Sequence, residues 1–340
     1  MNLSQIGLIG SLAIALPACG GSSPPAQTAG ATPASSSDNG QASLPASEPP
    51  PSPDVQSGVR AFDAGNYADA RKSFEAASKK NPNDYDAFYN LGLACEKLND
   101  PAAAESAYKA ALAIKPELDT AATALSSIYI DAGRNDEALA VARNGLAKHA
   151  GSAALHENMA IALAAKGDQD NATKEFSQAL QLTPNDAMFH LTFAHWLNVW
   201  RVRGATPHLD AARDLVKDDY PMTISVGHEY RMAAEFDSCV KTFDHAIAMK
   251  DGGEARTERA LCRLGMKDEK GMMADLQAAV DKEPTYAVGH YYLGGRLAMT
   301  KHYKEAAAEY AKYLELAPNG SLVKVASERM KAAQDAMKKK

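Results

Sequence analysis

The chain has 340 residues, and its 36 Lys and Arg against 42 Asp and Glu give a formal net charge of −6 at pH 7. This balance lacks the basic excess that binding to a phosphate backbone requires, so we expect no nucleic-acid partner. Hydrophobic residues make up 46% of the chain, but no apolar run reaches the roughly 20 residues that a membrane-spanning helix needs. A folded helical body is the class that remains.

The N-terminal residues are similar to a bacterial lipoprotein signal. Residues 6–16 form an apolar run, which is too short to cross a bilayer but has the length of a signal-peptide core. In lipoprotein signals, a Leu at −3 and a small residue at −1 precede a Cys that becomes lipidated, and Leu16, Ala18 and Cys19 match these positions. The resemblance implies a signal peptide over residues 1–18 and a lipid anchor on Cys19; the alternatives are an ordinary secretory signal and a misplaced start of translation.

The residues after this Cys predict how the body is attached. In Gram-negative lipoproteins an Asp at this point marks retention in the inner membrane, so Gly20 implies an anchor in the outer membrane of the cell envelope, facing the periplasm. Residues 20–53 are rich in Pro, Ser and Ala, contain no aromatic residue, and carry only Asp38 and Glu48 as charges. Such a segment cannot bury enough apolar surface to offset the entropy of ordering it. We therefore expect residues 19–54 to be the lipidated Cys followed by a disordered tether.

An internal period governs the rest of the chain. It is a repeat of about 34 residues, and several of its units have a proline at the same position. These prolines are Pro82, Pro116, Pro184, Pro284 and Pro318; the other units lack it. A proline ends a helix because it has no amide hydrogen and clashes with the preceding turn. These prolines therefore predict that a helix ends at the same point of each repeat.

Each unit of this period contains two amphipathic stripes. In the unit that starts at Tyr85, Leu91 and Gly92 belong to a first stripe, and Ala104 and Tyr108 belong to a second. Small residues within such stripes allow two helices to cross closely. Each unit is therefore expected to be a pair of helices.

The pattern resembles the tetratricopeptide repeat, whose units carry a bulky residue, Leu, Gly and an aromatic, then Ala, an aromatic, Ala and Pro. This resemblance implies an all-α fold, a right-handed α-solenoid of about eight helix pairs over residues 55–320. Near 187–219, Pro207 follows a longer connection than the family uses, which predicts an irregular fifth unit. Residues 321–340 alternate apolar and charged side chains, as expected of a capping helix. The eight units start near Pro51, Tyr85, Asp119, Ala153, Ala187, Tyr220, Gly253 and Ala287.

The remaining cysteines form no motif for zinc or c-type haem, because no two of them are spaced as C-x-x-C. Cys95 and Cys239 occupy core positions of their units, and we interpret them as small buried thiols. A disulfide between Cys239 and Cys262, in neighbouring units, is the alternative in an oxidising compartment.

Metal and enzyme chemistry are not expected. The four histidines of the irregular middle, His190, His195, His208 and His228, are not spaced i, i+4 in sequence order, so they do not form a metal-ligand pair on one helical face. No Ser or Cys has a nucleophile-elbow context, and no Gly pair has phosphate-loop spacing. We expect no cofactor and no catalytic residue.

The resemblance also implies a binding surface. Tetratricopeptide solenoids bind partners on the concave face lined by the first helix of each pair. Carrying the family positions over predicts a protein-binding groove of Phe62, Tyr89, Leu93, Glu96, Ile130, Asp131, Glu157, Leu191, His195, Asn198, His228, Arg231 and Tyr291. Acidic and apolar residues dominate its first half, so the expected partner is an envelope protein or peptide segment with apolar and basic side chains.

These features predict a non-enzymatic, membrane-anchored scaffold that presents this groove to envelope proteins. One alternative is a pilotin-like outer-membrane lipoprotein that assists assembly of a type IV pilus or secretion secretin. A remote alternative is a metal carrier or enzyme at the irregular fifth unit.

Overall fold

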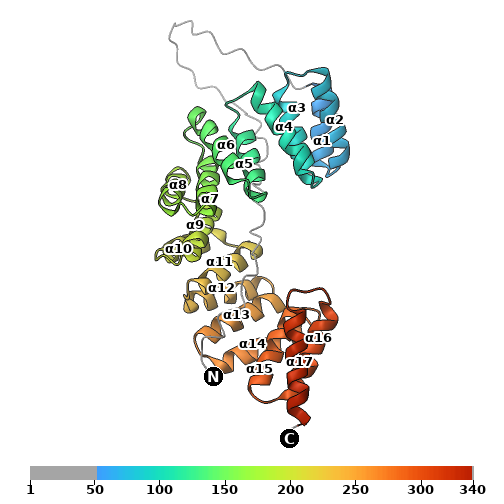
Figure 1. The fold of residues 1–340 in the computed structure, drawn as a ribbon, viewed down its shortest axis with the longest axis vertical. Helices are drawn as coiled ribbons and strands as arrows, with labels where there is room; N and C mark the ends of the chain where they lie inside the picture. The colour runs from blue at the N-terminus through green and yellow to red at the C-terminus, as the bar shows by residue number, and fades with distance from the viewer. Residues whose placement is uncertain (1–51, 339–340) are drawn as a thin grey trace, which may run out of the picture. The chain divides into compact units, whose positions relative to one another are not determined.

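The computed structural model describes residues 52–338, and in this range it contains seventeen α-helices and no strand (Figure 1). The predicted signal peptide, Cys19 and almost all of the predicted tether lie outside the described residues. The chain divides into two compact bodies, and the boundary between Glu175 and Phe176 falls within one helix, α8. We call them the N-terminal body and the C-terminal body.

The helices form eight consecutive pairs and one terminal helix, which confirms the predicted all-α fold. In each pair we call the odd-numbered helix the first helix and the even-numbered helix the second. The first four pairs are α1 (Pro53–Asp63) with α2 (Tyr67–Lys80), α3 (Tyr85–Lys97) with α4 (Pro101–Ile114), α5 (Asp119–Asp131) with α6 (Asn135–Lys148), and α7 (Ala153–Ala165) with α8 (Gln169–Leu182). The remaining helices are α9 (Ala187–Val199) with α10 (Ala205–Val216), α11 (Tyr220–Met232) with α12 (Phe236–Met249), α13 (Gly253–Gly265) with α14 (Glu269–Lys282), α15 (Ala287–Met299) with α16 (Tyr303–Leu316), and the terminal α17 (Val323–Lys338).

Local sequence explains where the helices begin and end. The side chains of Asp84 and Asp100 accept hydrogen bonds from main-chain N–H groups in the first turns of α3 and α4, as helix N-caps do. Gly65 and Gly133 have φ of 77° and 70° in the turns after α1 and α5, a left-handed conformation that glycine adopts without steric cost. From the second pair to the eighth, each first helix begins at the residue where the period predicted a new unit.

A glycine-to-aromatic contact sets the crossing of the two helices within several pairs. A Cβ on Gly58 or Gly227 would lie 2.5 Å from the ring of Phe74 or Phe243, sixteen residues later in the same pair. Gly92 faces Tyr108 in the same way. Because real Cβ contacts are never this short, each glycine lets an aromatic ring fill the space between two close helices.

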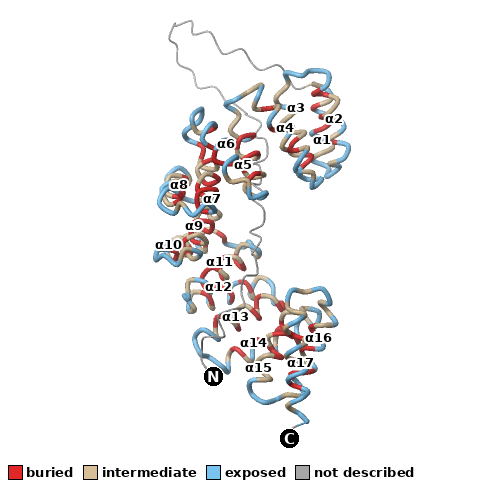
Figure 2. The backbone as a smooth tube through the Cα atoms, in the orientation of Figure 1, coloured by how far each residue is buried: buried red, intermediate tan, exposed pale blue. Residues whose placement is uncertain are grey.

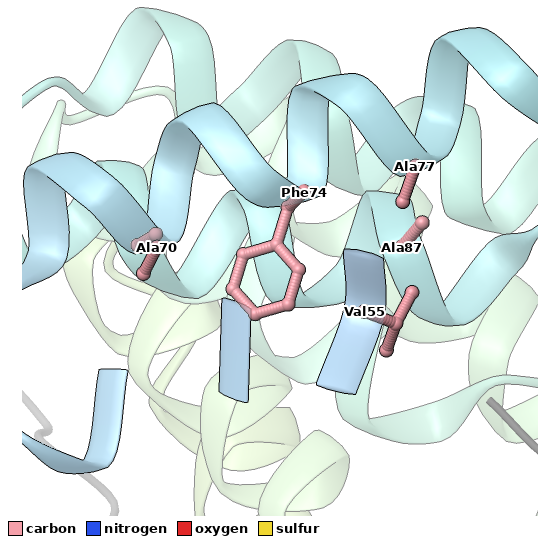
Figure 3. Close-up of a cluster of buried hydrophobic side chains, with 6 residues drawn as sticks. Val55, Ala70, Phe74, Ala77 and Ala87 are labelled. Atoms are coloured by element: carbon pink, nitrogen blue, oxygen red, sulfur yellow. The ribbon is translucent and has the colours of Figure 1, made fainter. Parts of the chain in front are cut away.

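The core of the first pair shows the result (Figure 3). Phe74 points from α2 toward α1 and packs with Val55, Ala70 and Ala77, and Ala87 from the next pair closes the cluster. All five side chains are buried, and buried residues likewise follow the packed faces of the other helices (Figure 2). Small residues therefore bring the helices together and large residues fill what remains.

The fifth pair is built differently from the others. Five residues, 200–204, connect α9 to α10, whereas three residues join the helices of the other seven pairs. Helix α10 begins at Ala205 after Gly204, which has a φ of 122°, and it is shorter than the second helices of the other pairs. Trp196 and Trp200, both half-buried at the end of α9, pack against each other with ring centroids 5.8 Å apart.

Overpacking a crossing tests this account. Ala104 of α4 is fully buried, so we expect Ala104→Leu to lower the free energy of unfolding by about 1–3 kcal/mol. Ala102→Leu, at an exposed position two residues earlier, should change it by less than about 0.5 kcal/mol. Denaturant unfolding of both variants measures the difference, and equal stability would contradict the packing described here.

Candidate functional site

In the N-terminal body, the predicted groove residues of the first helices are accessible in part. Phe62, Tyr89, Leu93 and Ile130 are half-buried on α1, α3 and α5. The ring of Phe62 packs edge-on against Tyr67, with centroids 5.2 Å apart, and the ring of Tyr89 lies 5.8 Å from that of Tyr108. These rings are therefore held in place while part of each apolar surface stays open to solvent.

The exposed charges beside these apolar side chains are mainly acidic. On α1, α3 and α5 the exposed charged residues are Asp63, Asp86, Glu96 and Asp131 against Arg60 and Lys97, a formal balance of −2 from four carboxylates and two cations. Desolvation raises the pKa of Glu96, which the Tyr108 hydroxyl partly offsets by donating to its Oε1 over 2.6 Å. Desolvation also raises the pKa of Asp131. A cationic group arriving at this surface would relieve the cost of keeping these carboxylates charged.

Three predicted groove residues are buried within the stack. The exposed fractions of Glu157, Leu191 and Tyr291 are 4%, 1% and 1%. The ring of Tyr291 lies 5.5 Å from that of Tyr313, and the guanidinium of Arg329 lies 5.3 Å from its centroid. These three side chains pack inside the protein and offer little surface to a partner.

In the C-terminal body, the predicted groove residues bind carboxylates of the neighbouring first helix. Glu229 of α11 is only 3% exposed. Nδ1 of His195, on α9, lies 2.8 Å from Oε1 of Glu229. The Asn198 side-chain amide donates to Glu229 Oε2 over 2.8 Å and to its main-chain oxygen over 3.0 Å. A buried carboxylate needs such partners, so these groups hold α9 to α11.

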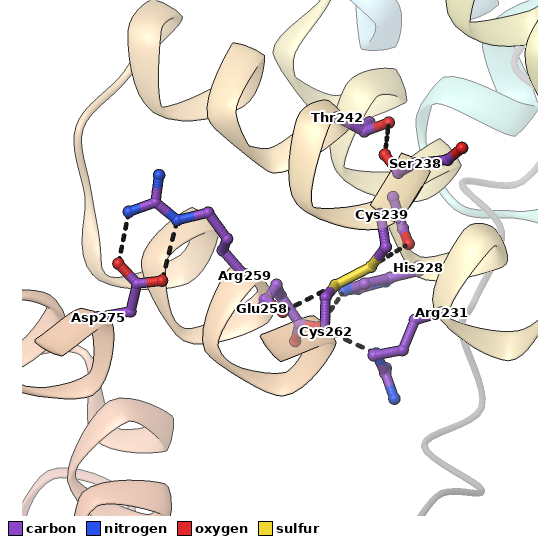
Figure 4. The surroundings of a disulfide bond; sticks show 10 residues. His228, Arg231, Ser238, Cys239, Thr242, Glu258, Arg259, Cys262 and Asp275 are labelled. Atoms are coloured by element: carbon purple, nitrogen blue, oxygen red, sulfur yellow. Dashed lines mark hydrogen bonds and ion pairs between the residues drawn. A yellow bond between two sulfur atoms is a disulfide. The ribbon is translucent and has the colours of Figure 1, made fainter. Parts of the chain in front are cut away.

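The next helix repeats this arrangement around Glu258 of α13. His228 Nε2 lies 3.1 Å and Arg231 Nε 3.5 Å from Glu258 Oε2 (Figure 4). Burial acts to raise the pKa of Glu258, but His228 and Arg231 outweigh it, so the pKa lies below its usual value. Four predicted binding residues, His195, Asn198, His228 and Arg231, are thus engaged in ties between first helices.

A second set of polar ties lies within the helix pairs, and the sequence reasoning missed it. His156 Nδ1 is 2.6 Å from Glu175, and His290 Nδ1 is 2.6 Å from Glu309. In both, the other ring nitrogen faces a main-chain carbonyl six residues earlier, at 3.2 and 2.9 Å. The histidine and the glutamate have the same sequence separation in both ties, and this spacing is the signal by which the sequence would have revealed them.

The seventh pair has the same tie in another chemical form. Arg256 and Asp275 have the sequence separation of the two histidine–glutamate ties, and their side chains approach to 3.9 Å. Asp275 is 2% exposed, accepts a hydrogen bond of 2.9 Å from Arg259 and forms an ion pair of 2.8 Å with Arg263. The buried charge is therefore compensated by three guanidinium groups.

The fifth pair replaces the acidic partner with a second histidine. His190 Nδ1 lies 3.0 Å from His208 Nδ1, and its Nε2 lies 3.1 Å from the carbonyl of Pro184. Burial, and then the neighbouring His190, lower the pKa of His208 from 6.5 to about 4. Among the described residues, no group of three His, Cys, Asp or Glu side chains could hold a metal ion.

Two helix pairs have smaller residues where the fourth, seventh and eighth pairs have the polar tie. Each of these two pairs contains a cavity at that place. Ala122 and Val141 line one of about 180 Å³, and Thr223 and Thr242 line one of about 150 Å³. Both pairs of residues have the same sequence separation as the polar ties. The polar side chains therefore also fill a crevice that small residues leave open.

Cys239 and Cys262 form a disulfide that joins α12 to α13 (Figure 4). Their Cα atoms are 6.0 Å apart, and the two residues are 23 apart in sequence. The interpretation of Cys239 as a buried thiol is therefore wrong, because the stacking of neighbouring pairs places Cys262 beside it. Cys95 is a free, buried cysteine.

Comparison with known proteins decides the family. The model of the tetratricopeptide repeat family matches residues 56–119 and 123–187. In these residues the chain belongs to the tetratricopeptide repeat family. Comparison with curated sequences gives no match.

Solved structures share the fold at low identity. Yeast Tom70 is 15% identical over 84% of this chain, with a TM-score of 0.53, and this chain covers 64% of the length of that structure. A tetratricopeptide repeat protein from Parabacteroides merdae is 17% identical, covering 83% of this chain and 97% of its own, with a TM-score of 0.48. MamA from Desulfovibrio magneticus is 16% identical, covering 50% and 98%, with a TM-score of 0.44. At 15% identity the likeness to Tom70 concerns the fold alone.

The His190–His208 pair of this tetratricopeptide protein predicts a loss of stability in acid. The folded-state pKa of His208, about 4, lies below the unfolded value of 6.5, so protons favour the unfolded chain as the pH falls between these values. We expect His208→Gln, which cannot take up the proton, to flatten the dependence of unfolding free energy on pH between about 5 and 6.5. His149→Gln, at an exposed histidine, is the control, and an equal effect of both variants would refute the assignment.

The disulfide predicts a redox-dependent stability. Reduction of the purified protein should lower its free energy of unfolding by about 2–4 kcal/mol, because the closed loop restricts the unfolded chain. The Cys262→Ser variant should show no further change on reduction. A Cys239–Cys262 peptide in a non-reduced digest would establish the bond by mass spectrometry, and its absence from protein secreted by intact cells would contradict the pairing.

Proposed function

We propose that the protein is a non-enzymatic scaffold of the bacterial cell envelope that binds segments of other envelope proteins on the first helices of its N-terminal body. The observation that carries this proposal is the combination of half-open aromatic and aliphatic side chains with desolvated carboxylates there. Tyr89 and Leu93 supply apolar contact, and Glu96 and Asp131 supply negative charge. A segment with apolar and basic side chains satisfies both.

The location in the envelope is supported by two independent features. The residues up to Cys19 are similar to a lipoprotein signal, and the Cys239–Cys262 disulfide is of the kind that persists in oxidising compartments. None of the helices between residues 52 and 338 has the length and hydrophobicity needed to span a bilayer. In this proposal the lipidated Cys19 is the membrane attachment, in the outer membrane and facing the periplasm.

A pilotin-like role in the assembly of a secretin is a narrower form of the same proposal. It requires the same anchor and the same kind of surface, with a secretin segment as the partner. Loss of secretin multimers from a deletion strain would favour this form over a general scaffold.

Site-specific crosslinking in intact cells tests the binding surface. A photoreactive amino acid at Leu93, on the first helix of the second pair, should give discrete adducts with envelope proteins. The same group at Lys148, exposed at the end of a second helix, is the control and should not give them. Adducts from Lys148 but none from Leu93 would overturn the proposed surface.

Once a crosslinked partner is identified, Tyr89→Ala should weaken its binding at least tenfold, about 1.4 kcal/mol, because the ring supplies much of the apolar contact. Reversing Glu96 and Asp131 to Lys should slow association and reduce its dependence on salt. Binding of both variants at the wild-type rate and affinity would be the contrary result.

The anchor has a separate test. Cys19→Ser removes the thiol that would accept the lipid, so this variant should move from the membrane fraction to the soluble fraction. Wild type grown with labelled fatty acid should carry the label. Membrane association of the variant, together with unlabelled wild type, would exclude the lipoprotein assignment.

A further inference from the structure

The first helices of the C-terminal body expose apolar side chains at their C-terminal ends. Val199, Met232, Met266 and Met299 are 50%, 54%, 44% and 66% exposed, and each lies about one repeat length after the one before it. One of them ends each of the successive first helices α9, α11, α13 and α15, with Met266 as the C-cap residue of α13. We call these four residues the methionine row.

The stacking of the first helices places these ends in order along the body. Helix α9 contacts α11, α11 contacts α13, and α13 contacts α15 (Figure 1). Asn198, one residue before Val199, donates a hydrogen bond to Glu229, and Arg231, one residue before Met232, forms an ion pair with Glu258. The row is therefore carried on rigidly connected helices.

Exposed apolar residues concentrate here. Ten large hydrophobic side chains are exposed among the described residues, and six of them lie at these helix ends, the four of the row together with Val202 and Leu264. Single exposed apolar residues are ordinary, but a repeated set at one place in a fold marks a surface for association. Methionine is suited to such a surface because its flexible, polarizable side chain adapts to a partner.

Basic residues follow the row in a strained conformation. The turns after α9, α11, α13 and α15 contain Arg201, Ala234, Lys267 and Lys301 with φ of 56°, 58°, 61° and 65°, and three of these four residues are basic. Left-handed backbone is unfavourable for residues with a Cβ, and glycine is the residue that adopts it freely. No ion pair within residues 52–338 engages these three side chains. Three of the four turns therefore present a basic side chain on a backbone conformation that glycine would adopt more easily.

The N-terminal body shows that the fold does not require this arrangement. The corresponding turns carry Gly65, Asn99, Gly133 and Gly167, also at positive φ. The last residues of the corresponding helices are Asp63, Lys97, Asp131 and Ala165, and the C-cap residue Leu98 of α3, at the place of Met266, is the single large apolar residue exposed at these ends. The apolar row and its basic flank are therefore particular to the C-terminal body.

The acidic residues near the row are already engaged. Asp268 forms an ion pair of 3.9 Å with Arg263, and Glu269 pairs with Arg296, so a guanidinium compensates each of these carboxylates. Glu235 accepts a hydrogen bond from the neutral Thr206 hydroxyl and keeps its charge. One such carboxylate against Arg201, Lys267 and Lys301 leaves the surface apolar with a positive balance.

We propose that the methionine row, flanked by Arg201, Lys267 and Lys301, is a docking surface for an acidic amphipathic helix of a partner protein. Packed helices lie about 8–10 Å apart, which is close to the rise of about 10.5 Å over seven residues of an α-helix. Apolar side chains repeating every seventh residue of the partner would meet successive members of the row, and its carboxylates would face the basic turns. The inference rests on the proposed scaffold function and adds a second partner chemistry on a different body.

Peptide binding tests the proposal directly. The purified full chain is titrated into a labelled amphipathic helix of three heptads that contains only Leu and Glu, and into a matched helix of Leu and Lys, with fluorescence anisotropy as the readout. We expect the double variant Met232→Ser/Met299→Ser to bind the Leu/Glu helix at least tenfold more weakly than wild type. The Leu/Lys helix fits the acidic surface of the N-terminal body, so its binding should be the same in wild type and variant. Wild-type affinity of the variant for the Leu/Glu helix, or an equal loss for both helices, would overturn the proposal.

Two further variants separate binding from folding. Lys267→Gly/Lys301→Gly introduces the residue that the N-terminal body uses in these turns, so it should unfold at the same or a higher temperature while binding the Leu/Glu helix at least fivefold more weakly. Leu98→Ser, at an exposed position after α3 in the N-terminal body, is the matched control and should bind like wild type. Wild-type affinity of the glycine variant would contradict the role of the basic turns.

An anionic lipid surface is the competing occupant. Vesicles of phosphatidylcholine with phosphatidylglycerol should not sediment with the Cys19→Ser full chain, whose lipid anchor is absent. The chain could instead sediment with the vesicles, lose this sedimentation in Lys267→Gly/Lys301→Gly, and be unaffected by the Leu/Glu helix. That result would show that the surface binds lipid and not a protein. The crosslinking experiment at Leu93 concerns the other body, so failure of either test is distinguishable from failure of the other.

Discussion

The fold depends on how closely the two helices of each pair can cross. Gly58, Gly92 and Gly227 leave no Cβ between their helix and the aromatic ring sixteen residues later, and that ring then becomes the centre of the pair's core. Dense packing explains why this contact governs the rest, because one added methyl group would displace the ring and separate the helices. The surfaces of these three pairs are therefore positioned by contacts between a glycine and an aromatic ring.

Polar side chains then connect what the apolar core has positioned. Ties within the pairs, such as His156 with Glu175 and His290 with Glu309, fill a crevice within the stack, and carboxylates such as Glu229 hold successive first helices together. Buried charges of this kind stabilise one arrangement of the helices because any other arrangement would leave them without partners. Many polar side chains of the protein therefore serve to fix the geometry of the helix stack.

The two bodies present different chemistry at comparable places. The first helices of the N-terminal body expose Glu96 and Asp131 beside half-open apolar side chains, whereas those of the C-terminal body end in apolar residues followed by Lys267 and Lys301. A scaffold with one acidic and one basic surface can select partners of opposite charge, since complementary charge steers encounter and like charge excludes. In the proposed function, one repeated helix pair supplies both of these surfaces.

The sequence by itself determined the helix pairs, because the period of prolines, the small residues and the helical stripes are local signals that each pair repeats. It also located the apolar and acidic positions of α3 and α5, which depend only on the helical phase. Only the tertiary structure decided that Glu157, Leu191 and Tyr291 are buried and that His195, Asn198, His228 and Arg231 hold neighbouring helices. The tertiary structure also decided that Cys239 is bonded to Cys262 and that exposed apolar residues form the row that ends in Met299. Whether a side chain on a helix faces solvent, a partner carboxylate or another thiol depends on which helix packs beside it, and that neighbour is set by stacking between pairs, which no single repeat encodes.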